Sequence, residues 1–442
     1  MAKPRIINFK EGGVLIYNKR RKMKCTAAHI GFMVGSYHNG KDKGTAHFLE
    51  HMLFNGTESL SKDEFRNKVS FIVPGLNAGT SNTSTTAFFV RANDVLEQVF
   101  ELVSDMLINT NLTEENMKSE IGVIQEELRR KEIFDEENIT AQAKKSYGRN
   151  KSIYAVDCYD CLGTYEGLKN FKLKTLQAFK KRHYNLNNFI SVVTTSIPLY
   201  KIKKLLRKHF LSKLKLNRDY QKTHILFDAN RRENLTIALT KKNKLSIELG
   251  FKLDKKMEET ENDFNYRVLS NWIGERTITS FLTKRLRDEG LIYSAKTSID
   301  KCNNELFFKI NIDTGKDKLE KVIECINWAI NIARMEKISF EKLKEIKDNL
   351  IYEKYESNKP YPQKRNEQLL RNYCRFGEIK KSLTTRQLKK HLKSITPDTI
   401  YSLANEVFSM KTPLYITLLG NIEEKDFPSH KELKKMILKD KD

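Results

Sequence analysis

The sequence reads Gly44-Thr45-Ala46-His47-Phe48-Leu49-Glu50-His51-Met52-Leu53-Phe54-Asn55-Gly56-Thr57 in its first quarter. On a helix, His47 and His51 lie one turn apart on the same face, so two imidazoles can bind one Zn²⁺. Glu50 projects near the same ion, where it can take a proton from an activated water. The segment therefore predicts a hydrolytic zinc site. The alternative is a helix whose histidines are ordinary core or surface residues.

A second predicted helix supplies carboxylates for such a site. It begins at Thr113, and its apolar stripe contains Met117, Ile121, Ile124 and Leu128. Glu120 and Glu127 flank this stripe seven residues apart, since 127 − 120 = 7, and therefore share one face of the helix. Carboxylates beside a core need partners, and either a metal or the residues that orient its ligands would satisfy them.

Two regions of the chain resemble each other. Residues 175–179 lead into the apolar run 189–193, and residues 399–403 lead in the same way into 414–418, at an offset of 399 − 175 = 224. An earlier pair, residues 30–35 and 245–250, places Gly35 and Gly250 at an offset of 250 − 35 = 215. These offsets indicate a duplication. We expect domains over 1–215 and 225–442, joined by a polar linker over 216–224.

Composition sets the class of protein. The 442 residues are 39% hydrophobic, which is enough to build real cores and argues against disorder. No apolar run is long enough to span a membrane, and the first residues lack the apolar core of a secretory signal. Only six cysteines are present, which is too few for a disulfide framework and fits a reducing cytoplasm. Strand-like runs alternate irregularly with amphipathic helices, which predicts an α+β fold.

The charge invites a different interpretation. Lys and Arg number 80 and Asp and Glu 56, so 80 − 56 gives a formal charge of +24. Such a balance is typical of nucleic-acid binding, but the basic clusters accompany no recognisable nucleic-acid module. We expect the charge to be mainly solvated surface, with no nucleic-acid partner and no membrane partner.

The quoted motifs together resemble the insulinase/pitrilysin-type metallopeptidases, the inverzincins, and the length and two-half layout resemble the branch that includes mitochondrial processing peptidase. The family places a third metal ligand inside a Glu-x6-Glu pair a little over seventy residues beyond its His-x-x-Glu-His; here 127 − 51 = 76. The resemblance implies that His47, His51 and Glu127 hold zinc, that Glu50 is the base and that Glu120 supports the ligands. It also implies two homologous halves, each a mainly antiparallel sheet packed with helices, closing into a clam-shell chamber.

Two further motifs match this family. Residues 76–80 resemble its Asn-Ala-x-Thr strand, which implies that Asn77, Ala78 and Thr80 bind the substrate as a strand added to the edge of the sheet. The alternative is a polar turn. Residues 281–294 resemble its Leu-Arg…Gly-Leu-x-Tyr-Ser motif. This resemblance implies that Arg287 and Tyr293 bind the substrate backbone and the oxyanion, with a purely structural role as the alternative.

The sequence therefore predicts a zinc-dependent endopeptidase that cleaves short or unfolded peptides through a metal-activated water. The second half lacks the metal motif, so we expect one Zn²⁺ per chain. A cytoplasmic homodimer is favoured, and a heterodimer with an inactive homologue is the second choice. Two alternatives stay open: a catalytically paired subunit that processes one leader-bearing peptide, and a non-catalytic scaffold subunit.

Overall fold

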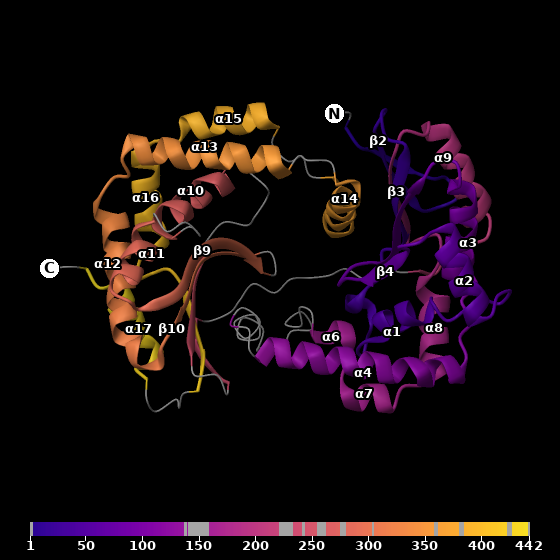
Figure 1. Cartoon of the computed structure of the whole chain (residues 1–442), viewed down its shortest axis with the longest axis horizontal. Helices are drawn as coiled ribbons and strands as arrows, with labels where there is room; N and C mark the ends of the chain where they lie inside the picture. Colours follow the sequence, from indigo (N-terminus) through magenta and orange to yellow (C-terminus); the bar gives the residue numbers. More distant parts are fainter. Residues whose placement is uncertain are drawn as a thin grey trace. The chain divides into compact units, whose positions relative to one another are not determined.

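The computed structural model describes residues 3–136, 139, 159–220, 233–240, 244–253, 262–274, 280–302, 305–357, 361–379, 384–421 and 427–440. The chain forms two compact units (Figure 1). Unit 1 comprises Met1–Arg130, Asp157–Ile225 and Pro360–Lys380, and unit 2 comprises Lys131–Val156, Leu226–Lys359 and Lys381–Asp442. Each unit combines one sheet with several helices, so the predicted α+β class is confirmed.

Unit 1 is built on a six-stranded sheet. Its strands, in spatial order, are β1 (Arg5–Asn8), β2 (Val14–Lys19), β6 (Phe189–Thr195), β3 (Cys25–Phe32), β5 (Thr85–Ala92) and β4 (Asn77–Thr80). Only β2 and β6 run parallel, and the other neighbours pair antiparallel. β6 is buried along its whole length, as its continuous apolar and β-branched sequence predicts. β4 lies at the edge of the sheet.

Helices pack against the sheet of unit 1. They are η1 (Ser36–His38), α1 (Thr45–Met52), α2 (Lys62–Ile72), α3 (Leu96–Ile108), α4 (Glu114–Glu136), α6 (Tyr159–Leu162), α7 (Tyr165–Lys169), α8 (Leu173–His183), α9 (Leu199–Leu206), η2 (Arg207–Leu211) and α14 (Pro362–Phe376). One large apolar core joins α1, α3, α4 and α8 to the sheet through alternate residues of β3, among them Ala28, Ile30 and Phe32. This alternation is what a strand with one face on a core requires.

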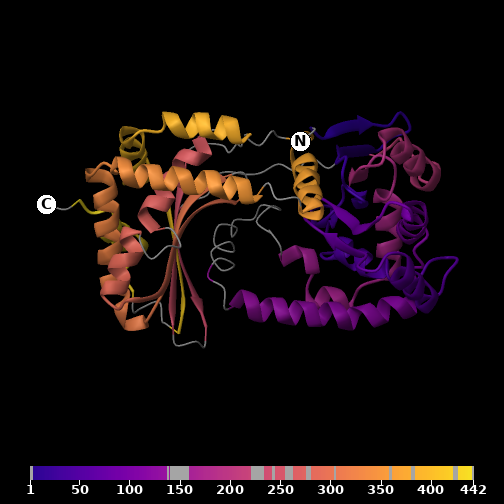
Figure 2. The ribbon, with the colours of Figure 1, turned by 45° about the horizontal axis from the view of Figure 1, so that its top comes forward.

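α14 comes from the second half of the sequence but belongs to unit 1, where it packs against β3 and β6 (Figures 1 and 2). Leu369 and Leu370 of α14 join a small apolar cluster with residues of β2 and β6. The buried Asn366 donates hydrogen bonds from Nδ2 to the backbone oxygens of Ala27, at 2.8 Å, and Val192, at 3.2 Å. Neither unit is therefore a single continuous stretch of sequence, and the predicted domain boundaries, 1–215 and 225–442, stay a prediction.

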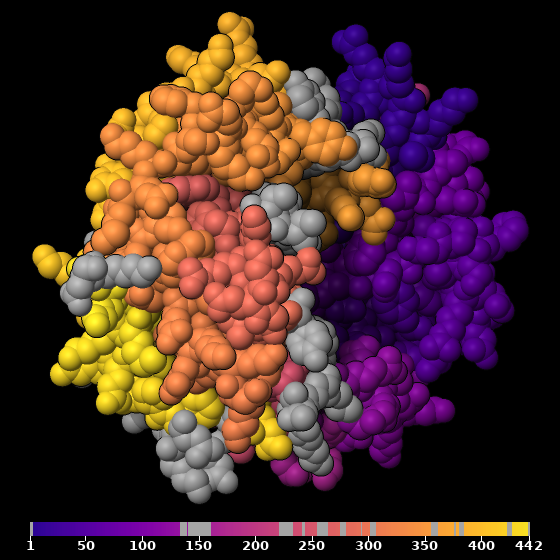
Figure 3. Space-filling model, turned by 60° about the vertical axis from the view of Figure 1, so that its left-hand side comes forward, coloured from indigo at the N-terminus to yellow at the C-terminus, as the bar shows by residue number. Residues whose placement is uncertain are grey.

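Unit 2 is built on a five-stranded sheet. Its strands, in spatial order, are β7 (Leu235–Leu239), β11 (Leu414–Gly420), β8 (Leu245–Leu253), β10 (Glu305–Thr314) and β9 (Ile292–Cys302). Its helices are α10 (Asn262–Gly274), α11 (Phe281–Asp288), η3 (Lys316–Lys318), α12 (Leu319–Met335), α13 (Phe340–Ser357), α15 (Thr385–Ser394), α16 (Pro397–Val407) and α17 (His430–Leu438). Figure 3 shows the helical surface of this unit, with α12 and α13 in orange and α17 in yellow.

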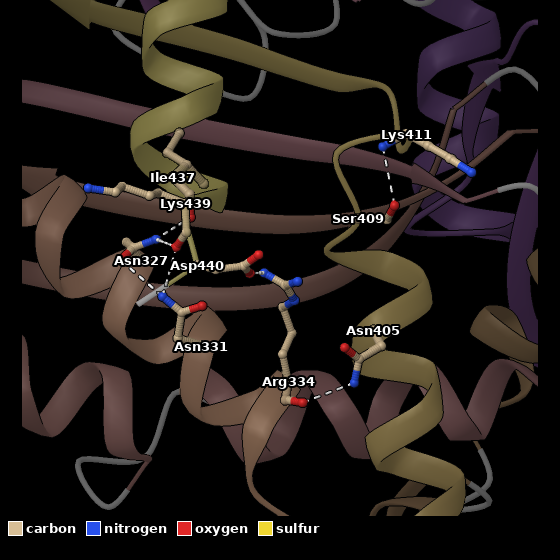
Figure 4. A network of polar contacts seen from close by, with 9 residues as sticks. All are labelled: Asn327, Asn331, Arg334, Asn405, Ser409, Lys411, Ile437, Lys439 and Asp440. Carbon is tan, nitrogen blue, oxygen red and sulfur yellow. Dashed lines mark hydrogen bonds and ion pairs between the residues drawn. The ribbon is translucent and has the colours of Figure 1, made fainter. Parts of the chain in front are cut away.

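Side-chain amides fix the end of α17 to α12 (Figure 4). Asn327 donates from Nδ2 to the backbone oxygens of Ile437, at 3.1 Å, and Lys439, at 2.8 Å. Asn331 donates to the same Lys439 oxygen at 3.0 Å, and Arg334 pairs with Asp440 at 2.6 Å. The last carbonyls of a helix have no partner within the helix, so these side chains satisfy them.

The two sheets share one topology, which confirms two homologous halves. In each sheet a central strand, β3 or β8, has an antiparallel neighbour on either side: β6 and β5 in unit 1, and β11 and β10 in unit 2. On its far side, β6 pairs in parallel with β2, and β11 pairs in parallel with β7. α8 and α16 also correspond, since 397 − 173 = 224. The sheet pairings, however, correct one detail of the sequence comparison.

The correction concerns the glycine that matches Gly250. Phe32 pairs with the first residue of β6, and Phe251 pairs with the first residue of β11, so Phe32 corresponds to Phe251. Gly250 therefore matches Gly31 rather than Gly35. A Cβ on Gly31 would lie 2.2 Å from the carbonyl oxygen of Thr85, which explains the glycine.

Candidate metal centre

α1 begins where the chain passes close to another loop. Gly44, which caps α1, has φ of 86°, and a Cβ there would lie 2.9 Å from backbone atoms of Gly163. Glycine is therefore required both by the left-handed conformation and by the close approach. From this cap the helix buries Ala46, Phe48 and Leu49 in the core. His47 and His51 lie on the side that meets α4.

Thr113 precedes α4 and caps it, because its hydroxyl accepts a hydrogen bond from the backbone N–H of Asn116 at 3.2 Å. Of the predicted stripe, Met117, Ile124 and Leu128 are buried, and Ile121 is half-buried. Glu120 is 7% exposed, whereas the side chain of Glu127 is 39% exposed. The two carboxylates thus share a face of α4 but differ in their access to solvent.

Three side chains converge on one point. The Nε2 atoms of His47 and His51 lie 3.5 Å and 3.4 Å from Oε2 of Glu127. The ligand atoms of these three residues all lie within 4.8 Å of one another. A tetrahedral ion with bonds of about 2.1 Å places neighbouring donor atoms about 3.4 Å apart. Two imidazoles and a carboxylate at this spacing fit Zn²⁺, and no other group of three such side chains was found in the described ranges.

The protonation of the two histidines differs because their partners differ. Burial and the neighbouring His51 lower the pKa of His47 to about 4. Burial also opposes a charge on His51, but hydrogen bonds to Glu120 and Glu127 outweigh it and raise the pKa of His51 to about 9. The hydrogen bond with His51 lowers the pKa of Glu127. In the metal-free protein a proton therefore resides on His51, and a bound cation would replace its charge.

Glu120 accepts from the ring nitrogen of His51 that points away from the centre. Its Oε2 lies 3.1 Å from Nδ1 of His51, and its Oε1 lies 3.0 Å from Nδ2 of Asn55. Because Nδ1–H is donated to Glu120, Nε2 is the nitrogen that faces Glu127 and that would lose its proton to bind a metal. The arrangement suits the supporting role predicted for Glu120.

Glu50 lies next to this centre but is not one of the three converging groups. It is 9% exposed, and burial raises its pKa. Thr80 acts in the opposite direction, because hydrogen bonding from its hydroxyl and backbone N–H lowers the pKa of Glu50. A buried carboxyl with a raised pKa is suited to accepting and returning a proton.

The other predicted residues lie in two places. Asn77, Ala78 and Thr80 form the edge strand β4, which packs against α1. Arg287 is exposed on α11 of unit 2, and Tyr293 follows at the start of β9, with its side chain outside the described residues. The structure thus brings together the residues of unit 1, while the roles of Arg287 and Tyr293 stay predictions.

Sequence reasoning missed two contacts of this centre. Thr80 is predicted only to bind substrate, yet it also lowers the pKa of Glu50. Asn55 was not singled out, although it lies within the quoted motif four residues after His51. The sequence shows only an asparagine one turn beyond a candidate ligand, and its burial is known from the structure.

Known proteins resemble this chain in both halves. Residues 14–156 match the insulinase family (peptidase family M16), and residues 170–350 match the peptidase M16 inactive domain. The β subunit of the mitochondrial-processing peptidase of Caenorhabditis elegans is 29% identical over 189 residues, which is 42% of this chain and 40% of that protein. The chain thus spans less than half the length of that relative. An uncharacterised zinc protease of Rickettsia felis is 24% identical over 90% of this chain and 93% of its own length.

Solved structures share the fold. The periplasmic protease PqqL of Escherichia coli superposes with a TM-score of 0.81 and 17% identity, over 99% of this chain and 50% of PqqL. A protease of Helicobacter pylori gives a TM-score of 0.70 and 20% identity over 95% of this chain and 99% of its own. Among the described residues, no helix has the length and apolar character needed to cross a bilayer. The cytoplasmic location stays a prediction.

Proposed function

Since the chain belongs to the insulinase family, peptidase family M16, we propose that it is a zinc-dependent endopeptidase that cleaves short or unfolded peptides. One observation carries the proposal: His47, His51 and Glu127 converge within 4.8 Å, and the buried Glu50 lies beside them. A centre with three protein ligands retains an open position, which is typical of catalytic rather than structural zinc sites.

The residues have distinct roles in this proposal. His47, His51 and Glu127 would hold one Zn²⁺ per chain, and Glu120 would orient His51. When bound, the ion supplies Lewis acidity, which makes a water nucleophilic near neutral pH and polarises a carbonyl. Glu50 would take the proton of that water and pass it to the leaving amine of the cleaved peptide.

Substrate would bind along β4. An edge strand offers backbone N–H and C=O groups to an extended peptide, and such pairing accepts many side chains. Asn77 and Ala78 would pair with the substrate backbone, and Thr80 lies at the end of the strand, where it lowers the pKa of Glu50. Arg287 and Tyr293 are proposed to bind the substrate backbone and the oxyanion; this part rests on the sequence motif alone.

The decisive test is Glu50→Gln. The amide keeps the size of the side chain but cannot accept the proton, so zinc content should stay unchanged while peptide cleavage falls about 10²–10⁴-fold. Zinc is measured by elemental mass spectrometry, and cleavage is measured by mass spectrometry of a peptide library with and without chelator. Unchanged turnover in the zinc-loaded variant would exclude the mechanism.

A paired role is the second candidate, and the mitochondrial relative favours it because that relative is named as the β subunit of a processing peptidase. The chain would then form a heterodimer with an inactive homologue and process one leader-bearing peptide; the first choice is a homodimer that acts on many peptides. A scaffold subunit without activity is the remaining alternative. Light scattering of the purified chain gives its assembly state, and cleavage by this chain alone would exclude both the obligate heterodimer and the scaffold.

A further inference from the structure

Asn55 links the two helices that carry the candidate ligands. It lies just beyond α1 and is 2% exposed. Its Nδ2 donates to Oε1 of Glu120 on α4 at 3.0 Å and to the backbone oxygen of His51 at 3.1 Å. In return, Nδ2 of Asn116 on α4 donates to the backbone oxygen of Asn55 at 3.0 Å. Both helices are therefore tied to the same residue.

The orientation of the Asn55 amide follows from its neighbours. Both groups that face Nδ2 are acceptors, a carboxylate and a carbonyl, so a flipped amide would place oxygen against oxygen. The opposite atom, Oδ1, is buried and makes no hydrogen bond. A buried acceptor without a partner is costly, and the side chain nevertheless keeps its donor toward Glu120.

This donor fixes the carboxylate of Glu120. With Asn55 on Oε1 and His51 Nδ1 on Oε2, each oxygen has one partner and the group cannot rotate without losing one of them. The neighbouring turn is held as well, because the backbone N–H of Glu58 donates to Asn109 at 2.8 Å and that of Asn111 donates to Gly56 at 3.2 Å. The segment that follows Asn55 is thus anchored as well.

We propose that Asn55 is a positioning residue of the metal centre: it holds Glu120 so that His51 keeps its proton on Nδ1 and presents Nε2 to the metal. The inference rests on the proposed zinc site but not on peptide cleavage. Residues that orient a ligand typically change metal affinity about 10–100-fold when they are removed. Asn55→Leu removes the donor and keeps the number and branching of the side-chain heavy atoms, and it should weaken zinc binding by about that factor.

The experiment measures zinc affinity by competition with a chromophoric chelator, together with the visible spectrum of the Co²⁺-substituted protein. Asn55→Leu is compared with Asn18→Leu, which removes another buried asparagine of unit 1. Nδ2 of Asn18 donates to the hydroxyl of Thr194 over a distance of 3.0 Å, and neither residue belongs to the metal centre. The first variant should lose affinity and shift the Co²⁺ spectrum; the second should lose stability alone. Equal zinc affinity in folded Asn55→Leu and wild type would overturn the proposal.

A double-mutant cycle separates positioning from a general structural effect. If Asn55 acts through Glu120, Asn55→Leu in a Glu120→Gln background should change affinity only within about twofold. A full additional loss in that background contradicts the proposal.

Should Asn55→Leu not fold, Asn55→Asp replaces only the donor and repels Glu120, so it should weaken zinc binding at least as much. Loss of cleavage in Glu50→Gln with unchanged zinc affinity in folded Asn55→Leu would refute this inference while leaving the proposed function intact.

Discussion

The central strands of the two sheets carry an ionisable side chain at the same position, neutral in one sheet and ion-paired in the other. Counting back three residues from the matched Phe32 and Phe251 leads to His29 in β3 and Glu248 in β8, which pair with the matched Val192 and Thr417. Both side chains are buried on the face of the sheet opposite the main core. His29 is kept neutral, because burial lowers its pKa to about 4. Glu248 instead pairs with Lys309 at 2.7 Å.

The same divergence separates the helices that follow these strands. α1 packs against α8 and β4, and α10 packs against the corresponding α16 and β9. α1 carries the two histidines of the metal centre, whereas α10 buries Tyr266, Leu269 and Ile273 in the core of unit 2. One duplicated framework thus supports a polar, convergent site in unit 1 and an apolar helix in unit 2. The candidate metal ligands thus lie in unit 1, and the corresponding helix of unit 2 contributes side chains to its core.

The ion pair of unit 2 gives the largest expected effect on stability. Lys309 and Glu248 are 1% and 0% exposed, and Lys309 also lies 3.5 Å from Asp300, so Lys309→Met removes an ammonium group from beside a buried carboxylate. Removing one member of a buried pair typically destabilises by about 3–5 kcal/mol. We expect unit 2 to unfold at lower denaturant concentration while α1 and α4 of unit 1 keep their amide-exchange protection, as measured by hydrogen-exchange mass spectrometry.

The double variant Glu248→Leu with Lys309→Met is the matched control. Replacing a buried pair by apolar residues is often neutral, so the free energy of unfolding should recover toward the wild-type value. An unchanged unfolding transition in the single variant would mean that this pair contributes no net stability to unit 2.

Metal removal should affect the other unit. A ligand present at 100 times its dissociation constant stabilises the folded state by about 2.7 kcal/mol. Chelation should therefore increase amide exchange in α1 and α4 by a corresponding amount and leave α10 unchanged. Glu127→Gln, which weakens the proposed site, should show little response to chelator. Equal exchange in α1 with and without chelator would argue against a bound metal at His47 and His51.

Much of this site was predictable because its residues follow helical periodicity. His47 and His51 are four residues apart, and Glu120 and Glu127 are seven apart, so each pair must share a helix face once the helix forms. The strands β6 and β11 were equally visible as continuous apolar runs. In these cases local spacing determines which side chains lie together.

Other features depend on contacts that no local pattern encodes. The apolar stripe of α14 is the same whichever sheet it covers, so Leu369 and Leu370 do not reveal that the helix packs on unit 1. Asn55 is a single amide without periodicity, and its partners are known only once α1 and α4 are adjacent. Glu248 and Lys309 lie 61 residues apart, since 309 − 248 = 61, and only the register of β8 and β10 pairs them.

His29 gives the smallest effect and the clearest contrast with Glu248. Its folded pKa of about 4 lies below the usual 6.5, so the stability it contributes is complete above pH 6.5 and is lost as the pH falls toward 4. The slope for one proton is about 1.4 kcal/mol per pH unit. The ring stacks on Phe88, and two groups of α14 partly offset the loss by favouring the protonated form: the carboxylate of Glu367 and a hydrogen bond with the backbone of Gln363. His29→Phe should therefore flatten the decline in unit 1 stability between pH 6 and pH 5 by about 1 kcal/mol, as measured by urea unfolding at each pH.

His209→Phe, at another buried histidine of unit 1 whose pKa is lowered less, should flatten this decline by a smaller amount. An identical pH profile for His29→Phe and wild type would show that His29 is not buried in its neutral form, and the contrast with the paired Glu248 would then fail.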